Sequence, residues 1–293
     1  MRPAALLADL SLLALGTLCR ETCAFAIPAS LPQFIRARPA AASGNFCLQM
    51  GATSALIETT ACQVLRLVLR NGRAAQVSCS VKSNGFELLQ GKLRGASVSG
   101  QDWASRLDLT ARSINVDVGS VAVDAAALLR HRVLRFLPPS PSGNAIVVFN
   151  AQDFGNFLVH PLIHGMDLAG RSFVFDREGV VVDPINRTVG FRGRWGEQKL
   201  CIELSQTTAR ERLVARVVHG VDGEAEGLED AAADHVASEV SDFFNNLEVD
   251  LDGPVLSFSS MSLEGRGIES GRLKLRLGIV VRKLPSIRAI ASF

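Results

Sequence analysis

The chain has 293 residues, of which 47% are hydrophobic and 20% charged, and its 31 basic side chains almost balance its 29 acidic ones. This length allows one large domain or two small ones, with a sizeable core. The near-neutral charge, with no stretch in which basic and aromatic residues alternate, argues against nucleic acid as a partner.

The first 24 residues have the features of a signal peptide. Arg2 precedes an almost entirely apolar run over residues 4–18. That run is shorter than the roughly 20 apolar residues that a membrane-spanning helix needs. Thr22 and Ala24 supply small residues at the positions that signal peptidase requires for cleavage before Phe25. We therefore expect residues 1–24 to be a signal peptide.

Residues 25–58 have the composition of a transit peptide or a disordered arm. Residues 22–57 contain no Asp or Glu but many alanines, with Arg36, Arg38, Ser30 and Ser43, and acid-poor sequence of this kind is typical of organelle transit peptides. A signal peptide followed by such a segment, with phenylalanine at the junction, resembles the two-part presequence of algae with complex plastids. The junction here is Ala24-Phe25-Ala26, and Ile27 separates it from the proline of that motif. The resemblance implies a plastid location, and the alternative is a secreted protein.

Residues 59–284 are expected to form the folded domain, with a C-terminal tail at residues 285–293. The cysteines of the domain, Cys62, Cys79 and Cys201, are odd in number and widely spaced, which is not the pattern of a disulfide framework or of a zinc or redox site. A Cys62–Cys79 disulfide stays open, and buried thiols are the alternative. No apolar run in the domain reaches a membrane-spanning length, so we expect any membrane contact to be peripheral.

Alternation of apolar and polar residues predicts that strands dominate the domain. The pattern is clear around Ile114, Val116 and Val118, where every second residue is apolar. Between Ala111 and Ile114 the apolar phase slips by one residue, which predicts a bulge or a short break in the strand.

Further strands are expected in the second half of the chain. Two hairpins are predicted, with Gly179 and Gly196 at or near their turns. Near the C-terminus, Leu273, Leu275 and Leu277 alternate with basic residues, which places them on one face of a strand.

Two or three helices interrupt the strands. Asn150 is a candidate N-cap for a helix that carries Phe154 and Phe157 and ends or kinks at Pro161. A shorter helix is expected over residues 124–136. The strongest helical pattern covers residues 229–251, with acidic residues opposite an apolar stripe made of Val236, Val240, Phe243, Phe244 and Leu247. Together the segments predict an α+β fold built on an antiparallel sheet and a long amphipathic helix.

Motifs for catalysis or metal binding are weak. His160 and His164 are four residues apart, a spacing that metal sites on helices use, but a proline lies between them and no third ligand is identifiable. Glu248, Asp250 and Asp252 are too few for a calcium loop and indicate a solvated strand face. The sequence has no nucleophile elbow, P-loop or dinucleotide-binding glycine pattern. We therefore expect no catalytic residue, no metal and no cofactor.

Three segments in chain order carry a family resemblance: residues 77–103, with a Leu88-Leu89-x-Gly91-x-Leu93 core, residues 114–129 and residues 243–277. From about Cys62 to Val281 the chain resembles the LmeA-like phospholipid-binding family, long catalogued as a domain of unknown function. The family is similar to tubular lipid-binding proteins such as the bactericidal/permeability-increasing protein. The resemblance implies a long curved antiparallel sheet wrapped against a long helix, phospholipid as the partner, and no catalytic residues.

The resemblance and the alternation favour a non-enzymatic protein that binds phospholipid or another membrane lipid in an apolar groove, and that could transfer it. The candidate lining comes from the inward faces of the helix and the last strand: Val236, Val240, Phe243, Phe244, Leu273, Leu275 and Leu277. A solid core without a cavity would instead favour a structural or assembly partner of a plastid membrane complex. An enzyme acting on a lipid or glycan would need His160, His164 and a carboxylate to converge in a cleft.

Overall fold

The computed structural model describes most of the predicted domain. The described residues are 58–59, 62–63, 69, 71, 76–83, 87, 90–105, 108–124, 135–161, 163, 166–168, 171–207, 212–218, 230–250 and 253–282. The predicted signal peptide, the transit segment before residue 58 and the tail at residues 285–293 lie outside the described residues.

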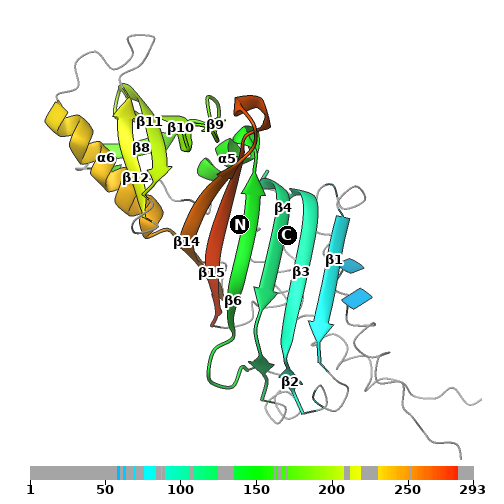
Figure 1. Ribbon diagram of the computed structural model, residues 1–293. Coiled ribbons are helices and arrows are strands. Elements are labelled where there is room, and N and C mark those ends of the chain that lie inside the picture. Colours follow the sequence, from blue (N-terminus) through cyan, green and yellow to red (C-terminus); the bar gives the residue numbers. More distant parts are fainter. Residues whose placement is uncertain are drawn as a thin grey trace, which may run out of the picture.

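Seven antiparallel strands form the larger of two main sheets (Figure 1). In spatial order they are β1 (Gln76–Lys82), β3 (Gly95–Ala104), β4 (Thr110–Val118), β6 (Ser142–Phe149), β15 (Arg272–Val281), β14 (Pro254–Glu264) and β13 (Glu248–Asp250). Two short strands, β2 (Lys92–Leu93) and β5 (Val121–Ala122), pair separately with each other.

The larger sheet has one apolar and one polar face, as the alternation predicted. One row of residues in register across five strands is mostly apolar: Cys79, Val98, Val116, Ala145 and Leu277. The neighbouring row, which points to the other side, is mostly polar: Ser78, Ser99, Asn115, Ile146 and Arg276. Because an antiparallel sheet of this kind is covered on one side only, the apolar face holds the core and the cavity described below.

The predicted phase slip lies inside β4 without breaking it. Gly100 pairs with Ile114 and Trp103 pairs with Ala111 in one unchanged register. Ala111 and Ile114 are nevertheless both buried, and the opposing strand has Asp102 between the two pairs with a φ of 49°. A left-handed residue of this kind is uncommon outside glycine, but the register of the two strands does not shift here, so the predicted bulge or break is not found.

The smaller sheet contains six strands in the order β12 (Leu213–Val218), β11 (Gln198–Gln206), β10 (Thr188–Trp195), β8 (Arg171–Phe175) and β7 (Met166–Leu168), with β9 (Val181–Asp183) also paired to β10. Its inner face is fully buried and rich in phenylalanine: Phe173, Phe175, Val189, Phe191, Ile202 and Leu204. The predicted hairpin at Gly196 is confirmed, since β10 and β11 pair across that turn.

The other predicted hairpin, around Gly179, is wrong. β8 pairs with Gly193–Trp195 and β9 pairs with Thr188–Gly190, so the two strands lie one after the other along the same edge of β10. The sequence pattern identified both strands correctly, but alternation does not specify which neighbour a strand pairs with.

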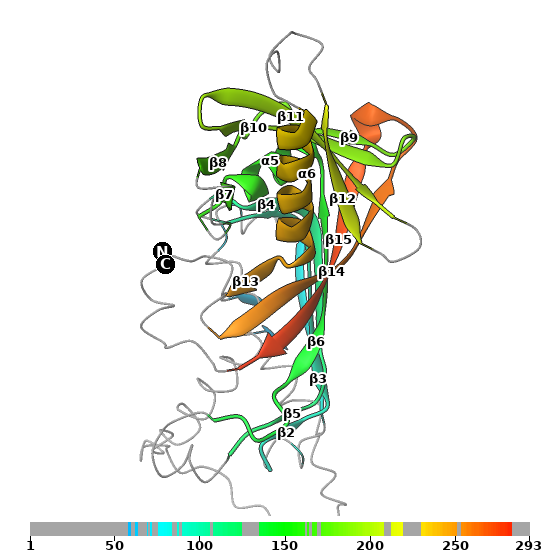
Figure 2. The ribbon, with the colours of Figure 1, turned by 90° about the vertical axis from the view of Figure 1, so that its left-hand side faces the viewer.

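Helix α6 (Asp230–Asn245) packs against β12 and buries Ala233, Val236, Val240 and Phe244 (Figure 2). Its polar side chains also protect the edge of the sheet. The side-chain amide of Asn245 accepts a hydrogen bond from the backbone N–H of Leu213 (2.9 Å) and donates one to the Leu213 carbonyl (2.8 Å). Ser241 Oγ accepts a further bond from the N–H of Ala215. The helix therefore occupies backbone groups of the smaller sheet's edge strand that could otherwise pair with another chain.

The second helix, α5 (Ala151–Leu158), begins at the predicted N-cap. The Asn150 side chain accepts a hydrogen bond from the Asp153 N–H, and the Asp153 carboxylate accepts one from the Asn150 N–H, which is a reciprocal capping arrangement. The helix predicted over residues 124–136 falls mostly outside the described residues. Val123, which precedes the segment, and Phe136, its last residue, form an isolated β-bridge, so Phe136 is not helical.

The fold is therefore antiparallel and sheet-rich, with helices packed on it. The sequence predicted one sheet around the long helix, whereas the strands divide into two sheets and α6 lies on the smaller one. Within the described part of the chain, no helix is both long enough and apolar enough to cross a membrane.

Candidate functional site: an apolar hollow

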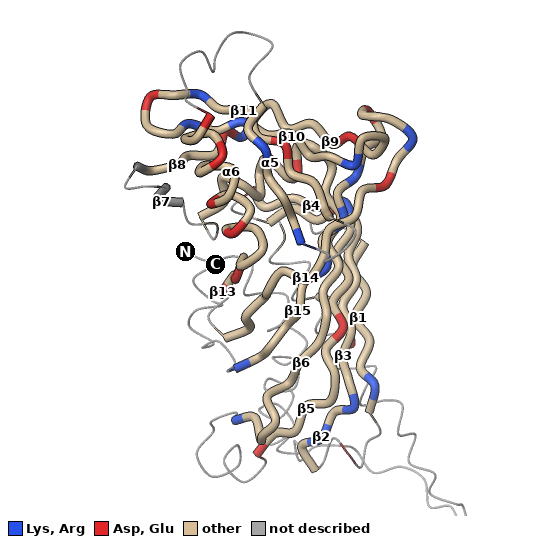
Figure 3. The backbone as a smooth tube through the Cα atoms, turned by 60° about the vertical axis from the view of Figure 1, so that its left-hand side comes forward, with Lys and Arg blue, Asp and Glu red and all other residues tan. Residues whose placement is uncertain are grey.

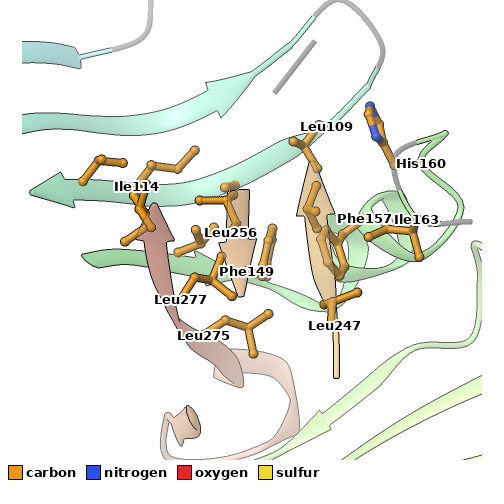
Figure 4. Close-up of a pocket in the computed structure, with 16 residues that line it drawn as sticks. Leu109, Ile114, Phe149, Phe157, His160, Ile163, Leu247, Leu256, Leu275 and Leu277 are labelled. Carbon is orange, nitrogen blue, oxygen red and sulfur yellow. The ribbon is translucent and has the colours of Figure 1, made fainter. Parts of the chain in front are cut away.

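A cavity on the apolar face of the larger sheet is the strongest candidate for a binding site (Figure 4). We call it the apolar hollow. Its volume, measured as the space open to the centre of a water molecule, is about 80 Å³. Sixteen described residues line it: Leu109, Ala111, Ile114, Val116, Ala145, Val147, Phe149, Phe157, His160, Ile163, Leu247, Val249, Leu256, Leu275, Leu277 and Ile279. All are apolar except His160.

The floor of the hollow is built by three adjacent strands, β4, β6 and β15. Ala145 lies at its centre, paired with Val116 on one side and Leu277 on the other. The alternation of these strands turns all three side chains to the same face. Alanine is the smallest of the three, so its side chain takes up the least of the space above the sheet.

Helix α5 and the turn after it form one wall. Phe157 extends from the helix towards Phe149 on β6, and their ring centroids are 5.4 Å apart. After the helix, the N–H of His160 donates to the Phe157 carbonyl (3.1 Å), and the N–H of Ile163 donates to the His160 carbonyl (2.8 Å). These backbone bonds hold His160 and Ile163 in the lining, where the His160 side chain lies near Leu109 (Figure 4).

A polar network fixes α5 in this position. Thr110 Oγ1 donates to Asp153 Oδ1 (2.5 Å) and accepts a bond from Asn156 Nδ2 (2.9 Å), while Arg177 Nε donates to Asn156 Oδ1 (2.6 Å). Asp153 and Asn156 are buried, so these hydrogen bonds offset the cost of removing them from water. Gly155 lies against the Arg177 backbone, where a Cβ atom would come within 2.1 Å of the Arg177 carbonyl oxygen.

None of the described lining residues presents a charged group to a ligand. His160 is 2% exposed, and burial lowers the pKa of its imidazole below the usual 6.5. The ring is therefore neutral at physiological pH. A pocket with fifteen apolar side chains and one neutral imidazole suits a hydrocarbon ligand and excludes an ionised group.

Two of the predicted lining residues, Leu275 and Leu277, do line the hollow. Leu273, on the same strand, is completely buried but is not part of the described lining.

The four predicted lining residues on the helix lie outside the described lining of the hollow. Val236 and Val240 are fully buried in the core beneath α6. Phe243 lies 5.9 Å from Phe175, and Phe244 lies 5.7 Å from Phe191, measured between ring centroids. The reason is that α6 packs on the smaller sheet, so its apolar side chains are buried between the helix and that sheet.

Most of the lining was missed by sequence reasoning. Ile114 and Val116 were identified as inward-facing strand residues but were not assigned to a cavity. Strand β6 was not predicted because its run from Ala145 to Phe149 is continuously apolar, which hides the alternation. Its neighbour in the chain, α5, was predicted as a helix, but nothing in its sequence indicates that Phe157 reaches over β6.

The described residues do not support the histidine, acidic or disulfide sites that the sequence left open. His164 lies outside them, and no three His, Cys, Asp or Glu side chains among them come together as a metal site. Glu248 and Asp250 are exposed on either side of buried Val249, as expected for a solvated strand face. No disulfide joins Cys62 to Cys79, and the Sγ of Cys62 donates to the Val77 carbonyl at 3.7 Å.

Comparisons of the chain with protein-family models, with curated proteins and with solved structures found no match.

Proposed function

We propose that this protein binds the acyl chain of a phospholipid or another membrane lipid in the apolar hollow, without catalysing a reaction. The observation that carries the proposal is the lining itself, in which neutral His160 is the sole polar side chain among sixteen described residues. Each methylene group moved from water into such a site contributes about 0.8 kcal/mol. A few methylenes are therefore enough for measurable affinity.

The hollow also restricts how a lipid would bind. Removing an ionised headgroup from water without a partner is far more costly than burying hydrocarbon is favourable. The acyl chain therefore enters and the headgroup stays at the open mouth. Selectivity in this arrangement comes from chain length and shape more than from the headgroup.

The proposal also concerns where in the cell the protein acts. The resemblance to the LmeA-like family and the plastid-type presequence support lipid binding at a plastid membrane. As part of the proposal, the fold is related to that of tubular lipid-binding proteins. A hollow that is open on one side allows a lipid to exchange, which is compatible with transfer between membranes.

The proposal is tested by titrating the purified protein with a fluorescent fatty acid whose emission rises in an apolar environment. We expect saturable binding that unlabelled phospholipid displaces. If the probe shows no saturable binding and no lipid is taken up from liposomes, the proposal is wrong. A stable protein partner recovered in place of lipid would then favour the assembly function.

A further inference from the structure

The 293 residues contain a single Asn-x-Ser/Thr sequon, at Asn186-Arg187-Thr188. A tripeptide of this kind, with any residue except proline in the middle, is the acceptor motif for N-linked oligosaccharides in the secretory lumen. The predicted signal peptide would bring the chain into that lumen. Whether a bulky sugar chain fits at this asparagine depends on the surroundings of its side chain in the folded domain.

The sequon lies at the tip of the hairpin formed by β9 and β10. Residues 184–187 form the turn, and within it Asn186 and Arg187 are exposed. Arg187 has a left-handed φ of 57°. Thr188 then begins β10 and pairs with Asp183, the last residue of β9. A sequon in an exposed turn of this kind is open to modification, because a group attached there points away from the core.

The Asn186 side chain is held in place without using up its amide nitrogen. Its Nδ2 donates a hydrogen bond to Asp183 Oδ2 (2.7 Å). The Asp183 carboxylate also accepts bonds from the backbone N–H groups of Ile185 (2.9 Å) and Asn186 (3.1 Å). An asparagine amide has two hydrogens, so a sugar replaces one of them while the other continues to donate to Asp183. Attachment of a sugar therefore breaks none of the hydrogen bonds that shape the turn.

A polar groove beside Asn186 has room for the first sugars. Both Asn186 and Thr188 line it, and its volume, measured as the space open to the centre of a water molecule, is about 550 Å³. Gly190 leaves the space above β10 open, since a Cβ atom there would have Val181 Cβ as its nearest neighbour, at 3.8 Å. The groove is lined by two acidic and two basic side chains: Asp183, Glu203, Arg192 and Arg216. Figure 3 shows acidic and basic residues interspersed near β9 and β10. A groove of mixed charge suits an uncharged chain rich in hydroxyl groups, which donate and accept hydrogen bonds.

Exposed aliphatic side chains lie near the acceptor. Ile185, the residue before Asn186, is 73% exposed, the largest value among the exposed large hydrophobics of the described residues. Val181 on β9 is also exposed, as is Ile268, which begins the short helix η2 (Ile268–Ser270) packed against β9 (Figure 2). A bulky, soluble sugar chain at Asn186 would cover part of this apolar surface.

We infer that Asn186 is the acceptor of an N-linked oligosaccharide. In the transfer, Nδ2 displaces the diphosphate of a lipid-linked oligosaccharide. The bond from Nδ2 to C1 of the first sugar forms, the bond from C1 to the diphosphate oxygen breaks, and the nitrogen gives up one proton. The polar groove and the apolar hollow share no described lining residue, so the inference goes beyond lipid binding and does not rest on it.

The test is translation of the full chain in the presence of microsomes that carry the transferase. We expect the translocated chain to migrate more slowly on a denaturing gel by one oligosaccharide, and peptide N-glycosidase to reverse this shift. Asn186→Gln and Thr188→Ala should lose the shift completely. Thr188→Ser is the matched control and should keep it, because serine retains the hydroxyl that the motif requires. Asn246→Gln, at an exposed asparagine outside any sequon, should also keep it.

A chain that enters the microsomes, and is therefore protected from added protease, but carries no oligosaccharide would overturn the inference. A shift that persists in Asn186→Gln would overturn it as well. A chain that stays outside the microsomes would contradict both the inference and the predicted signal peptide. Fatty-acid titration of the glycosylated protein separates these results from the proposed function: absence of binding there contradicts the lipid site and leaves the acceptor site supported.

Discussion

Phe157 on α5 and Phe149 on β6 bring the helix and the floor of the apolar hollow together, with their ring centroids 5.4 Å apart. Both side chains line the cavity, although one comes from the helix and the other from the strand before it. The hollow therefore depends on how α5 sits on the larger sheet, and the first two predictions test its floor and this wall.

Filling the floor should block the site. In Ala145→Leu the added carbons project between Val116 and Leu277, and they occupy space that two or three methylenes of an acyl chain would use. At about 0.8 kcal/mol for each methylene, fatty-acid affinity should fall at least about tenfold, as measured by fluorescence titration. Ala215→Leu is the control, because Ala215 is a buried strand alanine of the smaller sheet outside the hollow. Equal affinity in the two variants would place the ligand elsewhere.

Moving α5 should damage both stability and binding. At a solvent-exposed position inside a helix, replacing Gly by Ala stabilises the helix by about 1 kcal/mol. At Gly155, however, the new Cβ atom would lie 2.1 Å from the Arg177 carbonyl oxygen. We expect Gly155→Ala to lower the free energy of unfolding by about 1–3 kcal/mol and to weaken fatty-acid binding by displacing Phe157. Urea denaturation and titration measure the two effects. Gly267→Ala, where no atom lies within 4 Å of the Cβ position, should change neither.

Acid should weaken the fold through His160. Burial lowers the pKa of this imidazole, so below pH 6.5 the unfolded chain binds a proton that the folded chain resists. The stabilisation is complete above the unfolded pKa and is lost as the pH falls towards the folded pKa, by up to about 1.4 kcal/mol per pH unit. His160→Phe should flatten this part of the pH profile of urea denaturation, with exposed His235→Phe as the control. An unchanged slope in His160→Phe would exclude His160 as its cause.

The edge of the smaller sheet should depend in part on the Asn245 side chain. Asn245→Ala removes both hydrogen bonds to the Leu213 backbone, and the free energy of unfolding should fall by about 1–3 kcal/mol. The neighbouring Asn246 is exposed, so Asn246→Ala should cost less than about 0.5 kcal/mol in the same denaturation experiment. A similar cost at both positions would mean that the edge protection contributes little.

Two sequence patterns that describe a single element were reliable. Leu273, Leu275 and Ile279 are buried on one face of β15 as their alternation predicted, and Asn150 caps α5 through the expected side-chain bond. Both features depend on residues close together in the chain, where periodicity and capping preference act directly.

The arrangement of elements was less predictable, because a periodic pattern shows which side of an element is apolar but not what covers that side. The stripe of α6 that contains Val236 and Val240 was assigned to the lipid groove, yet it packs on the smaller sheet. Conversely, Ala145 is central to the hollow because Val116 and Leu277 lie beside it, and these three residues are brought together only by pairing between distant strands.

The most direct test of the account is mass spectrometry of lipids extracted from the protein after purification without detergent, with Ala145→Leu and Ala215→Leu purified in parallel. The account predicts that a lipid with an acyl chain copurifies with the unmodified protein and with Ala215→Leu, and that its amount is strongly reduced in Ala145→Leu. The absence of bound lipid from the unmodified protein, together with no uptake from liposomes, would contradict the claim that the hollow is a lipid site. The same conclusion would follow if Ala145→Leu retained as much lipid as its control.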